Sequence, residues 1–194
     1  MIPRRILLPL IMTTLFTSLF ATIAHAGYES PEHTVVSKDG SFEIRDYPSL
    51  TLAVTPMEKR GEDGSFMKLF RFIGGRNDRG EKIAMTVPVI MTGTTSGSMG
   101  FIVPKKVAEA GVPAPSSPDV TITHRDAGRY AVLRFSGTGS PSASKEAGER
   151  LANWMKKHGV TPGGPPLYAY YNPPWTPWFL RHNEVLVPVA PAVP

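Results

Sequence analysis

Residues 42–54 read FEIRDYPSLTLAV, and this stretch indicates the fold class. Apolar and polar residues alternate from Phe42 to Tyr47, which is the period of a strand with one buried face. A second apolar stretch, residues 50–54, follows the Pro48-Ser49 break. The pattern predicts two β-strands, at 42–47 and 50–54, that pair antiparallel.

A helix and two more strands complete this first unit. One helical face is predicted from four residues spaced i, i+3, i+4 and i+7: Phe66, Leu69, Phe70 and Ile73. Gly74-Gly75 ends that helix. Strands are expected at 82–92, which Pro88 interrupts, and at 99–103. The first half therefore has the order ββαββ.

The second half repeats this order. We expect a strand pair at 120–123 and 129–135, a helix at 144–158, and strands at 167–171 and 184–189. The two halves can bury their apolar sheet faces against each other. The sequence thus predicts an α+β fold, a distorted eight-stranded antiparallel barrel with two helices outside, built from two ββαββ halves. The Pro-rich stretch 112–118 links the halves within one domain, because neither half alone has a generous core.

The N-terminus resembles a secretion signal. Arg4 and Arg5 precede an apolar run, and the triplet Ala24-His25-Ala26 is typical of a cleavage site. A membrane anchor is the alternative, but the run is short and contains Thr and Ser. We expect a signal peptide at 1–26, a domain at 27–194 with no membrane span after signal removal, and a periplasmic or secreted location. The chain contains no Cys, so no disulfide supports the fold.

Charge and motifs argue against several functions. Removing two basic residues with the signal lowers the formal net charge from +5 to +3, and Lys105-Lys106 and Lys156-Lys157 are isolated doublets, so nucleic-acid binding is not expected. No nucleophile elbow or phosphate-binding loop occurs. The histidines after residue 26 lack the spacing of a metal site. The sequence contains no recognisable catalytic constellation. Catalysis by a pair of carboxylates stays an open alternative, but we expect a protein that is not an enzyme.

Aromatic residues gather near the C-terminus in a loop that Pro173, Pro174 and Pro177 stiffen. They are Tyr168, Tyr170, Tyr171, Trp175, Trp178 and Phe179. Such a loop can cover the protein's own core, or it can form one wall of a pocket for a planar apolar ligand, which stacks favourably on rings. Composition alone leaves both alternatives open.

Five ordered segments resemble the signatures of the SOUL haem-binding family. They are Tyr28-Glu29, FEIRDY at 42–47, FMKLFRFIGGRN at 66–77, KIAMTVPV at 82–89 and YNPPWTPWFLRHNEV at 171–185. The resemblance spans nearly all of the chain after residue 26. It implies the twisted eight-stranded barrel with two helices, in agreement with the duplicated pattern.

The resemblance also implies a ligand site. Haem or another tetrapyrrole, held non-covalently, would lie in a groove between the first helix and the loop before the last strand. One wall would carry Phe66, Leu69, Phe70 and Ile73, and the other Trp175, Trp178 and Phe179. Arg71 matches a basic helix position that would neutralise propionates; Arg181 and Lys68 are nearby candidates, and His182 is a candidate ligand contact.

No axial iron ligand is inherited. Asp46 stands where one relative carries a proposed His ligand, and Thr176 stands where another carries a Lys that contacts propionate. The leading hypothesis is a carrier that sequesters or transfers its ligand. The alternatives are a tetrapyrrole-modifying enzyme using Arg71, His182 or Glu184, and a protein-interaction domain that docks through Trp178 to a partner the sequence does not identify.

Overall fold

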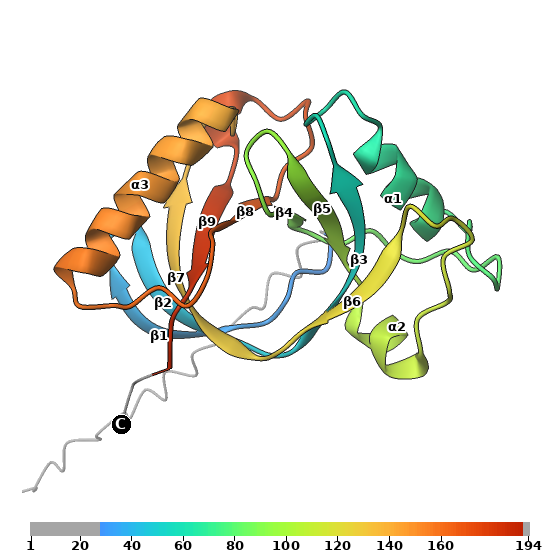
Figure 1. Cartoon of the computed structure of the whole chain (residues 1–194), viewed down its shortest axis with the longest axis horizontal. Coiled ribbons are helices and arrows are strands. Elements are labelled where there is room, and N and C mark those ends of the chain that lie inside the picture. The colour runs from blue at the N-terminus through green and yellow to red at the C-terminus, as the bar shows by residue number, and fades with distance from the viewer. Residues whose placement is uncertain (1–27, 192–194) are drawn as a thin grey trace, which may run out of the picture.

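The computed structural model describes residues 28–191, which form one nine-stranded antiparallel sheet with helices on its outer side (Figure 1). The predicted signal peptide lies outside the described residues. Between residues 28 and 191, no helix is long and apolar enough to cross a membrane. The elements are β1 (Thr34–Asp39), β2 (Phe42–Tyr47), β3 (Leu50–Met57), α1 (Ser65–Ile73), β4 (Val89–Met91), β5 (Gly97–Ile102), α2 (Lys105–Ala110), β6 (Thr121–Arg125), β7 (Gly128–Phe135), α3 (Pro141–Lys157), β8 (Leu167–Tyr170), the 3-10 helix η1 (Trp178–Leu180) and β9 (Asn183–Pro188).

The strand order confirms the α+β class and the duplication. It reads β1-β2-β7-β9-β8-β4-β5-β3-β6, and β4 pairs with β8 at the centre. Exchanging β2, β3, β4 and β5 for β6, β7, β8 and β9 reproduces every pairing except that of β1. The two ββαββ halves are therefore related by an approximate two-fold arrangement, with α1 and α3 in equivalent places.

Three described elements were not expected, namely β1, α2 and the 3-10 helix η1, and the sheet does not close by hydrogen bonds. β1 has no buried residue and places Val35 and Val36 side by side, so it lacks the alternation that predicts a strand. α2 is six residues long and also has no buried residue. The described fold thus has nine strands and three α-helices, and β1 and β6 are its edges.

The predicted pairing of strand 42–47 with strand 50–54 is wrong, and so is that of 120–123 with 129–135. β2 pairs with β7, and β3 pairs with β6. The register is continuous, since Tyr47 lies opposite Gly128 and Leu50 opposite Arg125. A two-residue hairpin turn requires positive φ, which Pro48 cannot adopt. The chain therefore continues as one bent two-stranded ribbon that joins the halves (Figure 1).

Two boundaries also differ from expectation. The strand predicted at 82–92 is confined to Val89–Met91, because Pro88 has no N–H to donate to a neighbouring strand. The second long helix begins at Pro141 rather than at residue 144. The Ser140 side chain caps it by accepting the Ala143 N–H at 3.3 Å, and proline suits the first helical position.

The sheet has two different faces. Helices α1 and α3 cover one face, where Leu69, Phe72, Leu151 and Met155 pack on strand residues such as Leu133. A smaller cluster lies on the other face, and it contains Tyr47, Tyr130, Val132, Leu167, Ala169 and Leu186. Because residues alternate along each strand, neighbours belong to opposite faces. Both faces are partly covered, and this decides the environment of the polar groups below.

Candidate functional site

Large apolar side chains stay in water mainly on two elements. Of the ten exposed ones in the described residues, seven lie on α1 or on the loop between β8 and β9. We name Phe66, Met67 and Phe70 the α1 patch. We name Trp175, Trp178, Phe179 and Leu180 the loop patch. Concentrated exposure of this kind marks a binding surface rather than ordinary surface scatter.

The α1 patch is the outer side of an amphipathic helix. The Phe66 and Phe70 rings stack with centroids 6.1 Å apart, and Phe66 also meets the edge of Phe101 at 5.2 Å. Leu69 and Ile73, two of the predicted ligand contacts, are instead buried in the core. The inward side contains Phe72, which the sequence pattern did not select, so the predicted helical face is rotated relative to the observed one.

The start of α1 is held by one carboxylate. Asp63 accepts the N–H of Ser65 at 3.0 Å through Oδ1, and the N–H of Glu58 at 2.6 Å through Oδ2. These hydrogen bonds, led by that from Ser65, lower the pKa of Asp63 to about 2. At the other end of the helix Arg71 is exposed, and no hydrogen bond or ion pair between residues 28 and 191 engages its side chain.

The loop patch is supported by its own backbone and by Arg181. The Arg181 guanidinium donates to the carbonyls of Pro174 and Thr176, the latter at 2.8 Å. It also donates to the Thr138 carbonyl at 3.4 Å. Sequence reasoning placed Arg181 at the rim as a ligand contact. The structure gives this side chain a positioning role within the loop.

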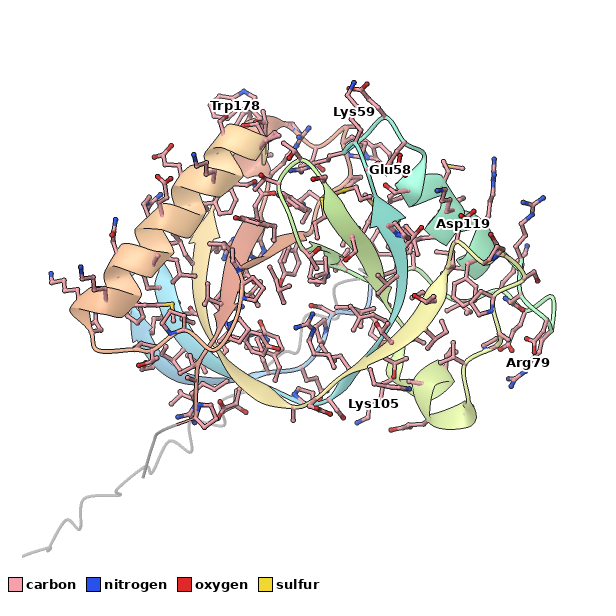
Figure 2. The ribbon with its side chains drawn as sticks, in the orientation of Figure 1. Glu58, Lys59, Arg79, Lys105, Asp119 and Trp178 are labelled. Atoms are coloured by element: carbon pink, nitrogen blue, oxygen red, sulfur yellow. The ribbon has the colours of Figure 1, made fainter. Side chains whose placement is uncertain are left out.

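The loop lies on the α3 side of the molecule. The Gly137 N–H donates to the Trp178 carbonyl at 3.2 Å, and Figure 2 shows Trp178 beside the start of α3. Trp175 is 81% exposed and Trp178 62% exposed, so both indoles point into water. The alternative in which these two rings cover the core is therefore wrong. Tyr168, by contrast, is buried.

One contact links the two sides. Arg60, in the connection before α1, donates to the Tyr170 hydroxyl at 3.0 Å and lies 4.3 Å above that ring. Within residues 28–191, no hydrogen bond or ring contact joins α1 itself to the loop. The groove between these elements thus stays a prediction.

The loop base rests on a buried charged network. Glu184 is only 1% exposed, and its oxygens accept both terminal nitrogens of Arg45 at 3.0 Å. They also accept the Tyr171 hydroxyl at 2.8 Å and lie 2.8 Å from Nε2 of His182. The Tyr171 and His182 rings stack in parallel, 4.1 Å apart. The first and last residues of the loop region are therefore clamped together over Glu184.

Burial and hydrogen bonding oppose each other in this network. Desolvation raises the pKa of Glu184, but the hydrogen bonds from His182 and Arg45 outweigh it and lower the pKa to about 2. Burial, followed by the charge of Glu184, raises the pKa of Tyr171. Sequence reasoning missed the Arg45–Glu184 pair. In the alternating pattern of their strands, Arg45 and Glu184 lie on the sheet face opposite the helices, and this face was expected to be exposed to solvent. The curled sheet buries that face as well.

A polar cavity of about 410 Å³ adjoins this network. Its charged lining consists of Lys38, Glu43, Arg45, Arg134 and Glu184. Both carboxylates are already paired, Glu43 with Lys38 and Glu184 with Arg45. A flat apolar ligand fits this mixed-charge lining poorly. Of the polar groups considered for catalysis, His182 and Glu184 meet here, but Arg71 lies on α1.

Known proteins resemble this chain in sequence and in fold. The family model described as "SOUL heme-binding protein" matches residues 28–188. "Heme-binding protein 2" of Homo sapiens is 30% identical over 172 residues, covering 82% of each chain, and that of Mus musculus is 29% identical over 171 residues, covering 81% of this chain and 82% of that protein. The structure of the "EcmrR C-terminal domain" aligns with a TM-score of 0.57, covering 77% of this chain and 96% of that chain, at 12% identity. The last likeness concerns the fold alone.

Proposed function

Because the chain belongs to the SOUL heme-binding protein family, we propose that it is an exported carrier that holds haem non-covalently and sequesters or transfers it. Membership of this family supports the binding of haem. The proposed site is the region between the α1 patch and the loop patch. Other flat tetrapyrroles would fit the same site, because ring stacking does not depend on the metal.

One observation carries the choice of site. The exposed large apolar side chains of the described residues gather on α1 and on the loop. Each 100 Å² of apolar surface that a ligand covers is worth about 2.5 kcal/mol before the cost of association. The four rings of Phe66, Phe70, Trp175 and Trp178 offer such surface without any rearrangement of the core.

Cationic groups near the α1 patch suit the propionates of haem. Arg71 is exposed in the last turn of α1, and Lys68 lies on the same helix. Charge-assisted hydrogen bonds from such side chains to carboxylates are the stronger kind. Arg181 would act indirectly, since its guanidinium holds the loop carbonyls.

We propose that no side chain ligates the iron. Asp46 is held by Arg129 through two bonds of 2.8 Å, and Nε2 of His182 faces Glu184. Binding would then depend on ring stacking and rim charges. Hemin and metal-free protoporphyrin should therefore bind with affinities within about tenfold of each other.

The test is a titration of protein spanning residues 27–194, which includes the whole described fold, with both porphyrins. Saturable quenching of tryptophan fluorescence is expected. A variant with Phe at positions 175 and 178 retains only Trp154, and its quenching should be much weaker. Phe70→Ala should weaken binding, whereas the equally exposed Val36→Ala on β1 should not. Absence of saturable quenching with either porphyrin would reject the proposal.

A further inference from the structure

We propose that the loop patch docks the protein on the surface of a lipid bilayer, with Trp175, Phe179 and Leu180 entering the boundary between headgroups and acyl chains. This inference goes beyond haem binding. It concerns the outermost part of the loop, and it does not require any haem to be bound.

The exposure of the loop patch exceeds what a flat ligand would cover. Phe179 is 60% exposed and Leu180 64% exposed, and Trp175 is exposed further still. A planar ligand contacts a ring from one side. Four large apolar side chains within six residues, all mostly in water, instead resemble a surface that enters an apolar medium. Trp is also the residue most typical of the bilayer interface.

Most polar groups of the loop backbone are either absent or already hydrogen-bonded, so the loop can lose its contact with water at low cost. Three of its residues are prolines and have no N–H to satisfy. From Pro173 to Trp178, every carbonyl except that of Trp175 accepts a hydrogen bond, from Thr176, Leu180, Gly137 or Arg181. Unpaired backbone groups are costly in an apolar medium, and lipid tails cannot satisfy them.

The unpaired backbone groups of the loop are three N–H groups and, in the described structure, the carbonyls of Trp175, Phe179 and Leu180. In the described structure the N–H groups of Trp175, Trp178 and Phe179 have no hydrogen-bond partner. Lipid headgroups present phosphate and ester oxygens, which are acceptors. The unpaired N–H groups therefore complement the headgroup layer in chemistry, and the side chains complement the layer beneath it.

The charges around the loop favour the same partner. No acidic residue occurs between positions 150 and 183 or between 127 and 145, which covers the loop and the β7–α3 connection against which it packs. The start of α3 beside the loop carries both signs, because Lys145 lies 3.9 Å from Glu149 and Glu146 is exposed next to it. The surroundings of the α1 patch carry both signs, since Glu58, Glu62 and Asp63 stand beside Lys59, Arg60, Lys68 and Arg71. Negatively charged headgroups would therefore meet no carboxylate within the loop itself.

The loop is also preorganised. The stacked Tyr171 and His182 rings lie over Glu184 at its base. Arg181 donates hydrogen bonds to carbonyls within the loop and so fixes its backbone. A rigid loop loses little conformational entropy on docking, so its exposed area contributes more fully to affinity.

The experiment uses haem-free protein spanning residues 27–194 with vesicles of phosphatidylcholine, alone or mixed with phosphatidylglycerol. We expect cosedimentation with the mixed vesicles and a blue shift of tryptophan emission. Lipids brominated on the acyl chain should quench Trp175 and Trp178. They should not quench the variant that retains only Trp154, which stacks on Phe42 at the opposite end of α3 from the loop.

Matched substitutions separate the two patches. Trp175→Ser with Phe179→Ser should weaken vesicle partitioning by about tenfold or more, whereas Phe66→Ser with Phe70→Ser should leave it unchanged. Circular dichroism checks that each variant is folded. Should a variant unfold, bromine quenching of the unaltered protein decides the question.

Three results would overturn the proposal. They are no binding to either vesicle type, binding without bromine quenching, and a concentration-dependent dimer that the loop substitutions abolish, which would assign the patch to a second copy. Haem titration without vesicles is a separate measurement, so failure of the carrier proposal and failure of membrane docking are distinguishable.

Discussion

The α1 patch and the loop patch expose the same kinds of side chain but differ in what lies behind them. Behind Phe66 and Phe70, the same helix places Leu69 and Phe72 in the core. Trp175 and Trp178 instead lie on a loop that Arg181 braces through backbone carbonyls, and Trp178 packs edge-on against Phe179, which is itself exposed. Helix α1 therefore contributes both to ligand recognition and to the stability of the core, whereas the loop contributes mainly to recognition. A loop braced by its own backbone can present rings to a partner without contributing them to the fold.

The largest effect on the free energy of unfolding is expected from a substitution at the base of the loop. Arg45→Met leaves the Glu184 carboxylate buried without its cation, which should lower the free energy of unfolding by about 4 kcal/mol. Urea denaturation measures this loss, and hydrogen exchange should show the loop loosening before α1 does. Adding Glu184→Leu should restore much of the stability. No restoration in the double variant would mean that Arg45 acts through other contacts, such as that with Tyr47.

The helix comes next. Leu69→Ala removes a completely buried side chain from the inner side of α1 and should cost about 3 kcal/mol in urea denaturation. Met67→Ala, on the outer side of the same helix, is the matched control and should change stability by less than about 1 kcal/mol. Equal losses for the two variants would contradict the burial pattern that separates the two sides of α1.

Acid should weaken the loop base. The pKa of Glu184 is about 2 in the folded protein, against an ordinary value of 4.5. Because folding lowers this pKa, the stabilisation is complete above the ordinary value and is lost as the pH falls from 4.5 toward 2. The loss should reach about 2 kcal/mol in urea denaturation, after allowance for coupling with Arg45. Glu184→Gln should remove most of this pH dependence, and an unchanged acid profile in that variant would exclude Glu184 as its source.

The smallest effect on stability is expected in the loop patch. Trp178→Ala should change the free energy of unfolding by less than about 1 kcal/mol, because the indole is mostly in water. The same variant should bind hemin about tenfold more weakly. Phe70→Ala should weaken hemin binding to a similar extent. Unaltered hemin affinity with Trp178→Ala would place the ligand on the α1 patch alone.

The local sequence pattern was sufficient to predict most of the helices and strands, but not to predict which strands pair. The alternation of 42–47 and the helical spacing of 66–73 are properties of a few consecutive residues, and both elements are present. Strand pairing is not local, and Pro48 turned an expected hairpin into a ribbon that pairs with a segment about 80 residues away. The pattern also could not tell which apolar residues of α1 face inward, because six of its nine residues are apolar and the sheet accommodated Phe72.

The amino-acid sequence by itself determined the duplicated ββαββ order, the SOUL resemblance and the presence of a proline-braced aromatic loop, since each is written in neighbouring residues. Only the tertiary structure decided that Trp175 and Trp178 stay in water, and that Arg45 meets Glu184 across 139 positions of the chain. The physical reason is that periodicity specifies which face of an element is apolar, whereas burial depends on what the folded sheet brings against that face.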